Sequence, residues 1–83
     1  MTVRLPALKA GEVIRALERG GFVVVRSVGS HHRLVHRDDP SRATTVAVHQ
    51  GRDLPRPMLH AILKQARLSP RGVSRIALPD YPD

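Results

Sequence analysis

The stretch Phe22-Val-Val-Val-Arg-Ser-Val-Gly-Ser-His-His-Arg-Leu-Val-His36 decides how this chain is expected to fold. Its first part, residues 22–28, is rich in β-branched residues and too short for a helix. It therefore predicts a strand with both faces largely covered. Gly29-Ser30 is a turn signal, and residues 31–36 predict a second strand. The connection between the two strands is so short that an antiparallel pair is favoured.

Two helices and a third strand are expected around this pair. Residues 10–19 have apolar side chains at helical spacing, followed by Gly20-Gly21 as a stop signal. Residues 44–49 predict the third strand, and from about Pro57 to Ala66 the helical spacing returns. The order α-β-β-β-α predicts an α+β, two-layer fold. A three-stranded antiparallel sheet would carry both helices on one face.

The composition limits the protein to a few classes. Its 83 residues suffice for one domain, expected over residues 1–69, with residues 70–83 as a C-terminal tail. The absence of cysteine excludes a disulfide scaffold, a thiol nucleophile and cysteine-ligated zinc. Phe22 and Tyr81 are the only aromatic residues, too few to stack single-stranded bases. No apolar run is long enough to cross a bilayer and no secretory signal is visible, so we expect a cytoplasmic protein without membrane contacts.

The charge is strongly basic. Fourteen lysines and arginines face seven acidic residues, for a formal net charge of +7. Only Lys9 and Lys64 are lysines, so arginine dominates, and its planar guanidinium suits bidentate contacts with phosphate. A polyanion is therefore the expected partner.

Histidines are the candidate groups for proton transfer. His32 and His36 have a spacing that would chelate a metal on a helix, but on a strand they stand roughly 13 Å apart, and we predict no metal site. Alternation places His32, Leu34 and His36 on the helix-covered face and His31 on the open face. His32 would then lie at the margin of the core, beside the Gly29-Ser30 turn. It is either a general base or an ordinary histidine at the sheet edge.

The other candidate chemistries lack support. No serine lies in a nucleophile elbow, no glycine-rich loop suits a nucleotide, and the aspartates lie in turns. His49 is expected near the start of the second helix, where it would position an anion, and His60 on a solvated surface. RNA cleavage needs one histidine and cationic groups, because the 2′-hydroxyl of RNA is an internal nucleophile.

Five segments together resemble one known family. They are Glu12-Val-Ile-Arg-Ala-Leu-Glu-Arg-Gly-Gly-Phe22, Gly29-Ser-His-His-Arg-Leu-Val-His36, Thr45-Val-Ala-Val-His49, Asp53-Leu-Pro55 and Leu59-His-Ala-Ile-Leu-Lys-Gln-Ala66. In this order and spacing, over roughly residues 10 to 69, the chain resembles the HicA (YcfA-like) toxins. These are small mRNA interferases of bacterial and archaeal toxin–antitoxin pairs.

The resemblance implies a double-stranded-RNA-binding-domain-like fold and cleavage of mRNA without a metal or small-molecule cofactor. It also implies neutralisation by a HicB-type antitoxin protein. The family's essential histidine matches His32, with His31 as the adjacent alternative, and Gly29 and Ser30 match the turn that presents it. We expect four basic residues to contact the RNA: Arg26, Arg33, His49 and Lys64.

The chain departs from the family at the ends of the second helix. Pro57 and Met58 stand where the family often has glycine and threonine, and Arg67 stands where a glycine usually closes the helix. Two other functions compete with mRNA cleavage. A non-catalytic RNA-binding module of the same fold is the main alternative. A DNA-binding repressor is disfavoured, because helices separated by the whole sheet do not form a helix-turn-helix.

Overall fold

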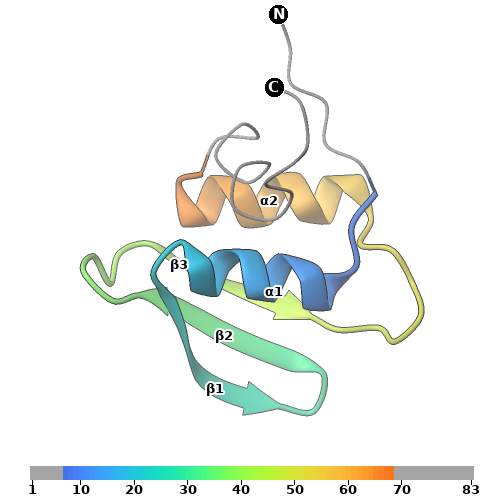
Figure 1. Ribbon diagram of the computed structural model, residues 1–83, viewed down its shortest axis with the longest axis horizontal. Coiled ribbons are helices and arrows are strands. Elements are labelled where there is room, and N and C mark those ends of the chain that lie inside the picture. The colour runs from blue at the N-terminus through green and yellow to red at the C-terminus, as the bar shows by residue number, and fades with distance from the viewer. Residues whose placement is uncertain (1–6, 69–83) are drawn as a thin grey trace, which may run out of the picture.

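Two helices cover one face of a three-stranded antiparallel sheet, which confirms the predicted α+β fold (Figure 1). The computed structural model describes residues 7–68, so the predicted tail lies outside the described residues. The elements are α1 (Ala10–Arg19), β1 (Phe22–Val28), β2 (His31–His36), β3 (Ala43–Ala47) and α2 (Arg56–Ala66). β3 begins one residue earlier and ends two residues earlier than the predicted 44–49. Neither described helix is long and apolar enough to cross a membrane.

The sheet has the strand order β1-β2-β3, and its register contains one irregularity. Val24 pairs with Leu34, but the next pair joins Arg26 to Arg33, so Val25 is an extra residue in β1. Such a β-bulge reverses the direction of the side chains that follow it. As a result Ser27 lies opposite His32 on the helix-covered face, while Arg26 lies on the open face.

The core lies between the sheet and the two helices. Leu34 and Val46 are fully buried at 0% exposure, which shows that their face of the sheet is the covered one. The apolar stripes of both helices complete the core cluster: Ala10, Val13, Leu17, Leu59, Ile62, Leu63 and Ala66. Thr44 is the buried polar side chain of this face, and its hydroxyl donates to Gln65 Oε1 at 2.7 Å. Burial on one face only explains why the opposite face carries polar and basic residues.

The prediction that both faces of residues 22–28 are covered is wrong. Val23, Val25 and Val28 have exposed fractions of 48%, 58% and 58%. The run of three valines has the composition of a strand buried on both faces. Both helices lie on the same side of the sheet, however, so the other face of β1, which carries Val23 and Val28, has neither α1 nor α2 over it (Figure 1).

A backbone hydrogen bond holds together the segments that precede the two helices. Leu54 N–H donates to the Leu8 carbonyl at 2.7 Å, which joins the segments that lead into α2 and α1.

Arg67 closes α2 in the left-handed conformation, with φ 56° and ψ 43°, where glycine is usual. Arg42 Nε donates to the Ala66 carbonyl at 2.9 Å and so supports this end of the helix.

Candidate functional site

His32 lies at the margin of the covered face, as the alternation predicts. The side chain is half-buried, and its strand neighbours are Ser27 on β1 and Val46 on β3. Its Nδ1 is 2.9 Å from the Ser27 hydroxyl oxygen, a hydrogen-bond distance. The hydroxyl is a neutral partner, unlike the carboxylate that orients histidine in a serine protease triad.

The turn before His32 is tied to the rest of the fold. Gly29 has a φ of 57° and Ser30 has a negative φ, the pattern of a two-residue type II′ hairpin turn. The Ser30 carbonyl accepts a hydrogen bond of 2.8 Å from Val48 N–H, just after β3. The positive φ of Gly29 and the hydrogen bond from Val48 to the Ser30 carbonyl hold the turn, and with it the start of β2, in one place.

Arg26 and Arg33 lie directly opposite each other on the open face, not on the face of His32. Like charges in this position repel, and neither arginine forms an ion pair with any of the residues 7–68. Arg33 Nη1 donates to Thr45 Oγ1 at 3.3 Å. The two arginines, with His31, Val28 and Thr45, line a hollow of about 320 Å³. This unbalanced positive charge favours an anionic partner on the open face.

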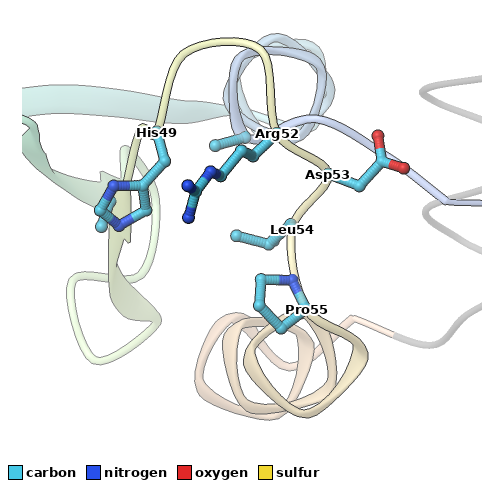
Figure 2. A pocket seen from close by; sticks show the side chains of 7 residues that line it. His49, Arg52, Asp53, Leu54 and Pro55 are labelled. Atoms are coloured by element: carbon cyan, nitrogen blue, oxygen red, sulfur yellow. The ribbon is translucent and has the colours of Figure 1, made fainter.

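His49 lies in the loop after β3, where a second pair of basic side chains meets. A hollow of about 150 Å³ is lined by His49, Arg52 and Pro55, together with residues from α1 and β3. Figure 2 shows the side chains of His49 and Arg52 pointing toward one another, while the Asp53 carboxylate points away. His49 therefore does approach the loop that enters α2. It also directly follows Val48, the residue bonded to the Ser30 turn.

The other predicted residues lie elsewhere. His36 contacts Phe22 edge-on, with ring centroids 5.1 Å apart, and its Nδ1 accepts a 3.1 Å hydrogen bond from Asp38 N–H, so its role is structural. His60 is exposed on α2, as predicted. Lys64 is in the last turn of α2, near the end of the sheet that carries Arg42 and His36, so the structure does not bring it to His32.

Ser27 and Arg52 are site residues that the sequence did not reveal. A strict alternation from Phe22 would place Ser27 on the open face, and a one-residue bulge has no clear signature in the sequence. Arg52 belongs to a loop, whose side-chain directions do not follow from periodicity. In residues 7–68, no three histidine or carboxylate side chains lie close enough to hold a metal ion together.

Comparison with protein families places this arrangement in a known group. The model of the HicA toxins of bacterial toxin–antitoxin systems matches residues 10–68, from the first residue of α1 to just beyond α2. The match includes the bulged β1, the turn and His32. A comparison with curated proteins finds no match. The chain therefore belongs to the HicA family of toxins from bacterial toxin–antitoxin systems.

Proposed function

We propose that the protein is an endoribonuclease that cleaves mRNA in the cytoplasm, is neutralised by a HicB-type antitoxin, and uses His32 as its general acid/base. The observation that carries the proposal is the position of His32. It is half-buried at the margin of the sheet, beside a fixed turn, in a basic member of a toxin family. A ring at this position is held by its surroundings and still reachable by a large substrate.

The proposed reaction is transesterification within the RNA strand. His32 removes the proton of a ribose 2′-hydroxyl, and the 2′-oxygen forms a bond to the adjacent phosphorus. The bond from phosphorus to the 5′-oxygen breaks, and that oxygen takes up a proton from solvent. The products are a 2′,3′-cyclic phosphate and a 5′-hydroxyl. The nucleophile belongs to the substrate, so the protein supplies proton transfer and positive charge only.

Basic side chains border the His32 end of the hairpin on both faces. His49 and Arg52 lie beside the loop that Val48 ties to the turn, and Arg26 and Arg33 occupy the open face. An RNA strand that passes the turn therefore meets positive charge on both sides of the sheet. Lys64 would contact only a strand that extends across α2.

Purified variants test the assignment of His32. The wild type is incubated with a labelled RNA in the presence of a chelator, beside His32→Asn, His31→Asn and His60→Asn. We expect His32→Asn to cleave about 10² to 10⁴ times more slowly, because general acid–base catalysis contributes that factor. His60→Asn is the matched control on exposed α2 and keeps the wild-type rate. Wild-type cleavage by His32→Asn, with loss in His31→Asn, would transfer the role to His31.

The alternative is an RNA-binding module without catalysis. Arg26 and Arg33 favour this alternative, because their charges have no acidic partner among residues 7–68 and suit RNA binding. They also lie on the opposite face of the sheet from His32. If the protein only binds RNA, the wild type and all three variants should retard the RNA in a gel and leave it uncleaved. Intact RNA with the wild type would therefore replace the nuclease by the binding module.

A further inference from the structure

We propose that Ser27 is a positioning residue that orients His32 so that Nε2 is its reacting nitrogen. The inference rests on the proposed ribonuclease function and adds to it a residue and an atom. Ser27 lies outside the segment Gly29-Ser-His-His32 that carries the family resemblance, and it follows the bulge in β1. Its hydroxyl is the group among residues 7–68 that contacts a ring nitrogen of His32 at hydrogen-bond distance.

The bulge at Val25 makes this contact possible. Without the bulge, Val25 would pair with Arg33, and the alternation would bring Arg26 to the covered face and place Ser27 on the open one. With it, Ser27 and His32 form a direct cross-strand pair, and their Oγ and Nδ1 atoms are 2.9 Å apart. Bulges often re-aim side chains beside functional sites. Here the result is a histidine held from the neighbouring strand.

The chemistry of imidazole then decides which nitrogen reacts. A neutral histidine carries one proton, and the nitrogen without it is the base. If the Nδ1–H group donates a hydrogen bond to Ser27 Oγ, Nε2 keeps a free lone pair and accepts the proton of the 2′-hydroxyl. In the resulting imidazolium, Nδ1 still donates to the same oxygen. The hydrogen bond therefore persists through proton uptake and release, and the ring does not need to turn during the reaction.

The opposite arrangement would not support catalysis by a base. If the Ser27 hydroxyl donates to Nδ1, Nε2 carries the proton and no nitrogen of the neutral ring is available to the substrate. The 2.9 Å contact is compatible with both arrangements. The tautomer of His32 is therefore the quantity that decides the proposal.

Nuclear magnetic resonance of ¹⁵N-labelled protein at a pH where His32 is neutral reads that tautomer directly. We expect the Nδ1–H form in the wild type and a mixture of both tautomers in Ser27→Ala. Ser27→Thr keeps the hydroxyl and should restore the wild-type spectrum. Val23→Ala is the matched control, since Val23 is an exposed residue of the same strand on the open face. An Nε2–H tautomer in the wild type would overturn the proposal.

Cleavage kinetics provide the second readout. Ser27→Ala should lower kcat by about three- to tenfold, the range that corresponds to one hydrogen bond, and leave KM unchanged. Ser27→Thr should recover kcat to within about twofold. Equal kcat in Ser27→Ala and the wild type would refute the positioning role even if His32→Asn is inactive. If instead His32→Asn cleaves normally while the spectrum shows Nδ1–H, the proposed function fails and the orientation of the ring stands.

Discussion

Gly21, between α1 and β1, shows how tightly the start of the sheet is packed. Its φ is 97°, a conformation that side chains rarely adopt. A Cβ atom at this position would lie 2.9 Å from His36 Nε2, closer than atoms normally approach. His36 in turn packs against Phe22 and accepts the hydrogen bond from Asp38 N–H. We predict that Gly21→Ala destabilises the fold by displacing His36.

The magnitude follows from three contributions. The positive φ costs about 1–2 kcal/mol for any residue with a Cβ. Displacement of His36 loses the edge contact with Phe22, about 0.5–1.5 kcal/mol, and the hydrogen bond from Asp38, about 0.5–1.5 kcal/mol. Together these give a loss of about 2–5 kcal/mol in the free energy of unfolding. For a domain of this size, where each kcal/mol shifts Tm by about 4–8 °C, the corresponding fall in Tm is about 8–40 °C.

Thermal unfolding of a small set of variants checks the reasoning. Gly51 also has a positive φ, 79°, but a Cβ there meets nothing within 4 Å, so Gly51→Ala reports the backbone cost alone. Gly21→Ala should cost about 1–3 kcal/mol more than Gly51→Ala. In a His36→Ala background that excess should vanish, because the clashing atom is gone. Equal losses at Gly21 and Gly51 in the wild-type background would refute the predicted clash.

Two further predictions concern charge. The double variant Arg26→Gln/Arg33→Gln should bind RNA with a salt dependence shallower by about 1.4 in log–log slope, about 0.7 for each lost phosphate contact. Binding titrations at several salt concentrations measure it, and an unchanged slope, equal to that of Arg37→Gln, would remove the two arginines from the RNA interface. A hydrogen bond from the Ser41 side chain lowers the pKa of Asp39 below its ordinary value of 3.8. Asp39 therefore stabilises the fold above pH 3.8, and this contribution is lost as the pH falls through the lowered pKa. Asp39→Asn should therefore make unfolding less pH-dependent below about pH 4 in acid titrations followed by circular dichroism, and an unchanged acid profile would contradict this.

Much of the fold follows from periodicity. The amphipathic pattern of residues 10–19 predicts α1 with its observed bounds, and the alternation of residues 31–36 predicts β2 and the covered position of His32. These elements are predictable because each buries one regular stripe or face against the core. The order of elements was sufficient to predict that both helices lie on the same side.

Features that depend on a single residue or on tertiary contacts were not predictable. The bulge at Val25 exchanges the faces of Arg26 and Ser27, so the sequence indicates neither the partner of His32 nor the separation of the arginines from it. Val23 is exposed because it lies on the open face, which neither α1 nor α2 covers. Arg67 adopts a left-handed conformation that its residue type does not favour, in a position supported by Arg42 at the end of α2.

The involvement of the 2′-hydroxyl is tested most directly by one substrate substitution. An RNA oligonucleotide that the wild type cleaves is synthesised again with a single 2′-deoxyribose on the 5′ side of the cleaved phosphate. If His32 transfers the proton of that hydroxyl, the substituted bond stays intact, and the all-RNA substrate yields a 2′,3′-cyclic phosphate and a 5′-hydroxyl. Cleavage at the deoxy position, or products with a 5′-phosphate, would contradict the proposed chemistry.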